Sequence, residues 1–133
     1  MKVKVAFVCV HNSCRSQIAE ALAKKYGSDV IEAFSAGTEL KDRINQDALR
    51  LIKEIYAIDM EETQKPKLID EIPRVDYLIT MGCNVSCPFL PYKYEKDDWG
   101  LDDPTGKSDE EFKKIIDIID EKVHSLIEKI KNK

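Results

Sequence analysis

The sequence lacks the features that mark a membrane protein or a nucleic-acid-binding protein. Its 133 residues carry a net charge of −4, and Lys and Arg form no dense run before the C-terminal tail. Nucleic acids are bound through concentrated positive charge, so no such partner is expected. The N-terminal apolar run is too short and too interrupted by lysine for a signal peptide or a membrane span. We therefore expect a cytoplasmic protein, and a monomer by default.

Cysteine is also scarce, with only Cys9, Cys14, Cys83 and Cys87 in the chain. Four cysteines in a cytosolic protein of this size need not form a disulfide framework. Cys83 and Cys87 have the spacing of a possible zinc ligand pair. No second pair matches it, so we expect no metal site. Transient redox chemistry is the better interpretation of these thiols.

The order of the predicted elements indicates a single α/β domain over residues 1–133. An apolar segment at 3–9 predicts a buried parallel strand, and apolar residues four apart predict a helix at 17–26. A second strand is expected at 30–34. A strand, a helix and a strand at this spacing form a parallel unit with a right-handed crossover.

The rest of the chain continues the alternation of helices and strands. The pattern predicts a helix at 45–56, a short turn at 68–72, a strand at 76–81, a fourth strand near 91–94 and a last helix from about Ser108. We therefore expect an open four-stranded parallel sheet with helices on both faces. Ligands of such folds bind beyond the carboxyl ends of the strands, where both Cys9 and the segment after Met81 lie.

The segment between the first strand and the first helix has the composition of an oxyanion-binding loop. It reads Cys9-Val10-His11-Asn12-Ser13-Cys14-Arg15-Ser16. Unpaired N–H groups and the helix dipole favour anions at a helix N-terminus, and a guanidinium fits two oxygens of a tetrahedral anion. The same surroundings favour a thiolate over a thiol. Cys9 is thus the candidate nucleophile, and Arg15 and the loop amides would bind the oxyanion. A buried structural cysteine beside an unrelated arginine is the alternative.

This loop, continued by Gln17-Ile18-Ala19-Glu20, resembles the oxyanion loop shared by low-molecular-weight protein tyrosine phosphatases and thioredoxin-coupled arsenate reductases. The likeness recurs at Phe34-Ser35-Ala36-Gly37, at Leu78-Ile79-Thr80-Met81 and at Asp98-Trp99-Gly100-Leu101-Asp102-Asp103-Pro104. It covers nearly the whole chain and is closer to the reductases. The resemblance implies the low-molecular-weight tyrosine phosphatase-like fold and reduction of arsenate to arsenite. It also implies that the protein has no tightly bound cofactor and depends on an external reductant, which we expect to be thioredoxin.

The resemblance also implies a relay of three thiols. Cys9 would attack arsenate, Cys83 would resolve the adduct, and Cys87 would complete an exposed disulfide for the reductant. Only three residues separate Cys83 from Cys87, which is shorter than the usual spacing in the reductases. Two loop cysteines without a redox role remain an alternative. The alternative function is a phosphatase that hydrolyses phosphomonoesters through a phosphocysteine, because thiols do not reduce phosphorus(V).

Further positions match functional residues of these families. Asp103 precedes Pro104 where both families carry a general acid, and Thr105 follows where phosphatases carry aromatic residues that frame a tyrosine. Asn12 and Ser16 are expected to fix the loop, and Ser16 to hydrogen-bond the Cys9 sulfur. Cys14 is interpreted as a structural part of the loop.

The resemblance also bears on potassium. Glu20 and Ser35 match positions near a potassium ion in some reductases, but Pro66-Lys67 replaces the third, acidic, partner. Potassium is therefore not expected, and a lysine can take the place of the cation.

Overall fold

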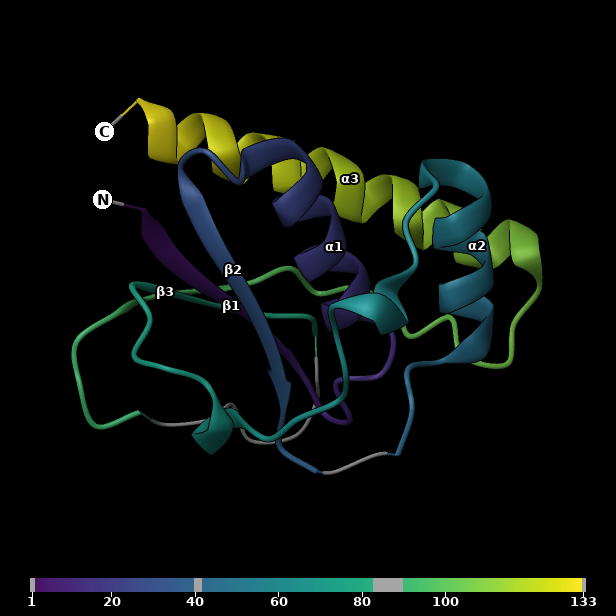
Figure 1. The fold of residues 1–133 in the computed structure, drawn as a ribbon, viewed down its shortest axis with the longest axis horizontal. Helices are drawn as coiled ribbons and strands as arrows, with labels where there is room; N and C mark the ends of the chain where they lie inside the picture. Colours follow the sequence, from purple (N-terminus) through teal and green to yellow (C-terminus); the bar gives the residue numbers. More distant parts are fainter. Residues whose placement is uncertain (1, 40–41, 83–89, 133) are drawn as a thin grey trace.

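A computed structural model describes residues 2–39, 42–82 and 90–132 of the chain (Figure 1). Cys83 and Cys87 lie outside the described residues. The elements, in chain order, are β1 (Val3–Cys9), α1 (Arg15–Gly27), β2 (Ile31–Gly37), α2 (Gln46–Tyr56), the 3-10 turns η1 (Met60–Glu62) and η2 (Ile69–Glu71), β3 (Tyr77–Thr80), β4 (Glu95–Asp98) and α3 (Asp109–Lys131).

The four strands form one parallel sheet in the order β2-β1-β3-β4, which confirms the predicted α/β fold. β1 is central and fully apolar from Val5 onward, because both of its faces are covered. At its carboxyl end Cys9 pairs with Gly37 of β2, and Val8 pairs with Thr80 of β3. The ends of the three strands therefore meet at one edge of the sheet, and the loop after Cys9 begins there.

The two faces of the sheet are covered differently. All three α-helices pack on the same side (Figure 1), and their apolar side chains join Phe7 of β1 in one core, with Ile18, Leu22 and Phe112 fully buried. On the other side Ala6, Val8 and Leu78 pack against apolar residues in and next to η2 and against Leu90 and Tyr94. Helices were expected on both faces of the sheet. Three α-helices cover one face, and the 3-10 turn η2 with neighbouring loop residues covers the other.

The predicted position of the fourth strand, near residues 91–94, is wrong. β4 spans Glu95–Asp98, and all four of its side chains are exposed. Backbone groups hold it against β3: Glu95 N–H donates to Asp76 O at 2.9 Å, and Trp99 N–H donates to Thr80 O at 2.8 Å. A charged edge strand of this kind has no apolar alternation, so no pattern in the sequence marks it.

The longest helix, α3, follows the predicted pattern. Ser108 caps its first turn by accepting a hydrogen bond from the Glu111 N–H at 3.3 Å. Its predicted apolar stripe is buried, and consists of Phe112, Ile115, Ile116, Ile119, Val123, Leu126, Ile127 and Ile130. The remaining positions are mostly charged. Within the described ranges no helix is both long and apolar enough to cross a membrane.

Candidate active site

A cavity of about 360 Å³ opens where β1 ends and α1 begins. It brings together most of the residues predicted for the site, and its walls are Cys9, Val10, His11, Ser13, Cys14, Arg15, Asp103 and Thr105. Asp103 comes from the segment after β4, so the fold joins two regions that are far apart in the sequence. A larger groove, of about 470 Å³, lies between β4 and α3, and no thiol is among the residues that line it.

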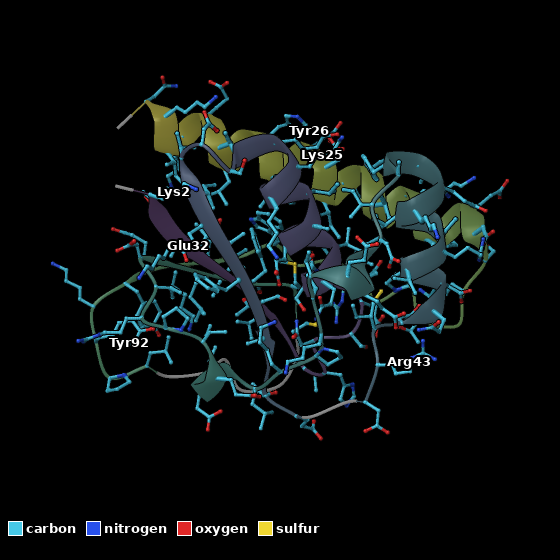
Figure 2. The ribbon with its side chains drawn as sticks, viewed as in Figure 1. Lys2, Lys25, Tyr26, Glu32, Arg43 and Tyr92 are labelled. Carbon is cyan, nitrogen blue, oxygen red and sulfur yellow. The ribbon has the colours of Figure 1, made fainter. Side chains whose placement is uncertain are left out.

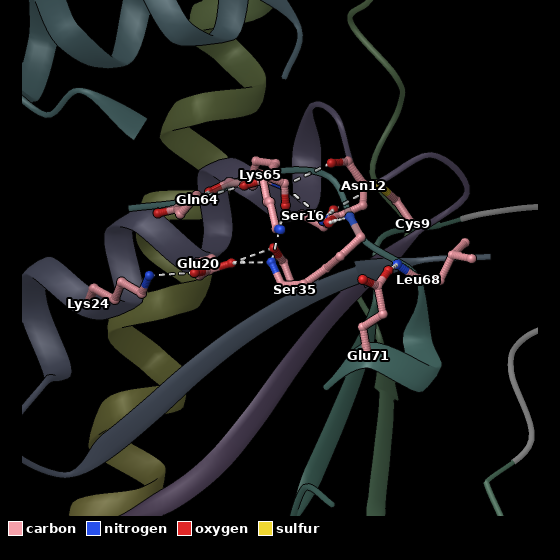
Figure 3. Close-up of polar contacts among 12 residues, drawn as sticks. Cys9, Asn12, Ser16, Glu20, Lys24, Ser35, Gln64, Lys65, Leu68 and Glu71 are labelled. Atoms are coloured by element: carbon pink, nitrogen blue, oxygen red, sulfur yellow. Dashed lines mark hydrogen bonds and ion pairs between the residues drawn. The ribbon is translucent and has the colours of Figure 1, made fainter. Parts of the chain in front are cut away.

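The side chain of Cys9 is buried and forms a hydrogen bond with Ser16. Only 4% of the residue is exposed, and its Sγ lies 2.9 Å from the Ser16 hydroxyl oxygen (Figure 3). Ser16 Oγ accepts a hydrogen bond from Asn12 Nδ2 at 2.8 Å. Because the amide already donates to this oxygen, the hydroxyl hydrogen can point at the sulfur. A hydrogen bond of this kind stabilises the thiolate form of Cys9.

The loop takes its shape from one left-handed residue and one close backbone approach. Asn12 has a φ of 53°, which asparagine tolerates better than most residues. Gly37, at the end of β2, lies directly against the loop: a Cβ there would be 2.7 Å from Val10 O and 2.9 Å from Asn12 N. Val10 O also accepts hydrogen bonds from the N–H groups of Thr38 and Glu39, at 2.9 and 2.8 Å. The loop is therefore seated on the carboxyl end of β2.

Arg15 begins α1 and is only 8% exposed. Its Nη1 donates to Met81 O and to Leu101 O, both at 2.7 Å. These bonds tie the ends of β3 and of the segment after β4 to the loop. Only one of the three guanidinium nitrogens makes these bonds. Since Arg15 also lines the cavity, the N–H groups of the other two nitrogens can bind the oxygens of an anion.

The loop contains a second cysteine, Cys14, which is also buried and lines the same cavity. Burial raises the pKa of the Cys14 thiol well above its usual range, and the charge of Asp103 adds to this effect. Cys14 therefore remains a neutral thiol. Asp103 itself is oriented by Thr105, whose backbone N–H and hydroxyl donate to Asp103 Oδ1 at 3.0 and 2.7 Å. The aspartate predicted as the general acid thus faces the same cavity as Cys9.

Next to the loop lies a buried polar group around Glu20, on α1. The Glu20 carboxylate accepts a hydrogen bond from Ser35 Oγ, and two ammonium groups flank it, Lys24 Nζ at 2.5 Å and Lys67 Nζ at 3.9 Å (Figure 3). Burial lowers the pKa of Lys67, and the carboxylate of Glu20 opposes that shift. A potassium ion would have to share this carboxylate with two ammonium groups. The residues present therefore do not fit a bound potassium ion.

Sequence reasoning missed two glutamines that support the loop. Gln17 Nε2 donates to Asn12 O at 2.9 Å and to Asn12 Oδ1 at 3.1 Å, and Gln64 Nε2 donates to Gln17 O at 3.0 Å and to Gln17 Oε1 at 2.7 Å. Gln17 directly follows the loop in the sequence, so a contact between its side chain and the loop could have been predicted. Gln64 stands 47 residues further on, where only the tertiary structure shows its role. Figure 2 shows the described side chains on the ribbon, with Lys25 and Tyr26 at the end of α1 that is opposite to the loop.

A parallel α/β sheet with a cysteine at the end of its central strand, and an arginine opening the next helix, defines the class of cysteine-dependent enzymes with an oxyanion-binding loop. The chain belongs to the family of the low molecular weight phosphotyrosine protein phosphatases, whose family model matches residues 4–133. It is 36% identical over 129 residues to an arsenate reductase of Brevibacillus brevis, and the match covers 96% of each chain.

Solved structures give the same result. An arsenate reductase in the phosphate binding state superposes with a TM-score of 0.84 at 37% identity, over 98% of this chain and 99% of that one. A thioredoxin-dependent arsenate reductase of Corynebacterium glutamicum superposes with a TM-score of 0.79 at 34% identity, over 98% of this chain and 62% of that one. The family and the fold expected from the sequence are thereby confirmed.

Proposed function

We propose that this chain is an enzyme that reduces arsenate to arsenite through a covalent adduct on Cys9. The observation that carries the proposal is the cavity in which the Cys9 sulfur, the Arg15 guanidinium and Asp103 meet at the N-terminus of α1. Relatives that match nearly the whole chain are arsenate reductases, which supports arsenate as the substrate.

In the first step the Cys9 thiolate attacks arsenic and one oxygen of arsenate leaves as water. The N–H groups of the loop from Val10 to Ser16, together with Arg15, bind the oxygens that remain. Asp103 faces the same cavity and supplies the proton that the leaving oxygen needs. A sulfur–arsenic bond forms and an arsenic–oxygen bond breaks, with no change yet in oxidation state.

The second step takes two electrons from thiols. In our proposal the Cys83 thiolate attacks Cys9 Sγ, a Cys9–Cys83 disulfide forms, and the electron pair of the sulfur–arsenic bond leaves with arsenic as arsenite. Cys87 then attacks Cys83, which releases the Cys9 thiolate and leaves a Cys83–Cys87 disulfide. An external dithiol reduces this disulfide. The thioredoxin-dependent neighbour supports thioredoxin in that role, and a reducing compartment such as the cytoplasm suits the cycle.

A phosphatase is the second candidate, because the matching family model is that of phosphotyrosine phosphatases and Asp103 lines the same cavity as Cys9. Its phosphoryl adduct on Cys9 would be hydrolysed by water without any change in oxidation state. The described walls of the cavity favour the reductase. No aromatic side chain is among them, and Thr105 follows Pro104 where an aromatic residue would frame a tyrosine.

The experiment that separates the two functions follows NADPH consumption with arsenate. Thioredoxin with thioredoxin reductase, or glutathione and glutaredoxin with glutathione reductase, are supplied in turn. We expect turnover with thioredoxin. Cys83→Ser should abolish this turnover and leave hydrolysis of p-nitrophenyl phosphate unchanged, whereas Cys9→Ser should abolish both. Full arsenate turnover in Cys83→Ser would contradict the relay. Phosphate ester hydrolysis without any arsenate-dependent NADPH consumption would favour the phosphatase.

We also propose that Lys67 takes the place of a monovalent cation beside Glu20. This proposal is supported by the position of Lys67: its Nζ lies 3.9 Å from the Glu20 carboxylate, and its side chain is only 17% exposed. Arsenate turnover should therefore be equal in potassium and sodium chloride at matched ionic strength. A several-fold preference for potassium would contradict this assignment.

A further inference from the structure

A continuous line of hydrogen bonds reaches the Cys9 sulfur from outside the oxyanion loop (Figure 3). It passes from Gln64 Nε2 to Gln17 Oε1 at 2.7 Å and from Gln17 Nε2 to Asn12 Oδ1 at 3.1 Å. It continues from Asn12 Nδ2 to Ser16 Oγ at 2.8 Å and ends between Ser16 Oγ and Cys9 Sγ at 2.9 Å. Gln64 is 6% exposed, and Gln17, Asn12 and Ser16 are fully buried.

Backbone groups determine the direction of every bond in this line up to the Ser16 hydroxyl. Lys67 N–H can only donate, and it donates to Asn12 Oδ1 at 3.0 Å, so Asn12 must turn its Nδ2 toward Ser16. Gln17 Nε2 also donates to the backbone carbonyl of Asn12, and Gln64 Nε2 to the backbone carbonyl of Gln17. A carbonyl can only accept, so neither glutamine amide can be reversed. Every amide therefore points its donor toward the loop. Because Ser16 Oγ accepts from Asn12, its own hydrogen can point at the Cys9 sulfur.

We propose that Gln17 and Gln64 are positioning residues that favour the thiolate of Cys9 through Asn12 and Ser16. Hydrogen bonds aligned head to tail in a buried site polarise one another, so each upstream donor strengthens the next bond. The last bond is the one to sulfur, and it is strongest when sulfur is negative. Gln64, two residues after η1, is therefore part of the apparatus that activates Cys9 although it touches neither the sulfur nor the anion.

The inference rests on the proposed function only in taking Cys9 as the nucleophile. It is tested without arsenate, by alkylation of Cys9 with iodoacetamide as a function of pH. The variants are made in a Cys83→Ser, Cys87→Ser background, and the site of modification is read by tandem mass spectrometry. The charged and titratable groups facing Cys9 from the loop, from α1 and from the segment after β4 are His11, Cys14, Arg15 and Asp103, and neither the main variant nor its control changes them.

The main variant, Gln64→Met, keeps the length of the side chain and removes its donor. We expect the pH of half-maximal alkylation to rise by about 0.5 unit, which is about a threefold slower reaction at lower pH. Gln64→His restores an N–H donor and should return the curve toward the parent. Gln46→Met is the matched control, because Gln46 Nε2 also donates to a backbone carbonyl, that of Ile44 at 2.9 Å, but lies outside the line.

A purely structural role for Gln64 would lower the thermal midpoint and leave the pH curve in place. That result overturns the inference, as does a Gln64→His curve shifted as far as that of Gln64→Met, or an equal shift in Gln46→Met. If Gln64→Met does not fold, Gln64→Leu also removes the donors without adding a charge, and an unshifted curve in that variant is equally decisive. Absence of arsenate turnover in the protein with all four cysteines, together with the expected shift of the alkylation curve, would count against the proposed reaction alone.

Discussion

Replacing Ser16 with alanine tests the activation of the nucleophile most directly. The hydroxyl of Ser16 lies 2.9 Å from Cys9 Sγ, and both residues are buried. A hydrogen bond to a charged group contributes about 1.5–3 kcal/mol, and 1.36 kcal/mol corresponds to one pH unit. Ser16→Ala removes the donor and so disfavours the thiolate. The pH of half-maximal alkylation should therefore rise by about 1–2 units.

The same variant also changes stability. Asn12 Nδ2 donates to the Ser16 hydroxyl at 2.8 Å, and the substitution leaves that buried N–H group without this acceptor. An unsatisfied buried donor costs about 1–3 kcal/mol, so the free energy of unfolding in urea should fall by an amount in this range. Ser28→Ala is the matched control, since Ser28 is an exposed residue at the other end of α1.

The assay is the rate of iodoacetamide alkylation of Cys9 between pH 5 and pH 10 in the Cys83→Ser, Cys87→Ser background. Ser28→Ala should reproduce the parent curve. If the curve of Ser16→Ala also coincides with that of the parent, the hydroxyl does not stabilise the thiolate. The reasoning from the 2.9 Å contact would then be refuted, and with it the line of donors that ends there.

Three further substitutions test other parts of the site. Since the folded state raises the pKa of Cys14 above its ordinary value of 9.0, the free energy of unfolding should fall as pH rises beyond that value, and urea unfolding should show a smaller fall in Cys14→Ala. Gly37→Ala places a Cβ 2.7 Å from Val10 O, so it should cost about 1–3 kcal/mol in urea unfolding and weaken phosphate binding in calorimetry. Arg15→Lys removes donors from two buried carbonyls as well as from the anion; it should lower the thermal midpoint and the phosphate affinity together, and an unchanged thermal midpoint would contradict the double role of Arg15.

The local pattern of the sequence was sufficient for the central part of the site. A run of apolar residues ending in Cys9, followed by Arg15 six positions on and then a helical pattern, determines a strand, a loop and a helix N-terminus with little help from the rest of the chain. Such signals are strong because a buried strand and an amphipathic helix impose their periods on neighbouring residues. The buried stripe of α3 was predictable for the same reason.

Elements without a periodic pattern were located less well. β4 exists because its backbone pairs with β3, and its exposed, charged side chains give no sign of that pairing. The prediction at 91–94 followed the apolar residues of the neighbouring loop instead. Those residues include Tyr94, which packs on the face of the sheet that the three α-helices do not cover.

The contacts that tune the site are the part that only the tertiary structure decided. Arg15 donates to carbonyls 66 and 86 residues away, and Gln64 donates to Gln17 across 47 residues. A sequence states which side chains can donate or accept, but a hydrogen bond depends on distance and direction, and these are set by how the sheet, α1 and the segment after η1 pack. The residues that can carry the chemistry were therefore determined locally, whereas the partners that hold them in register were determined by the fold.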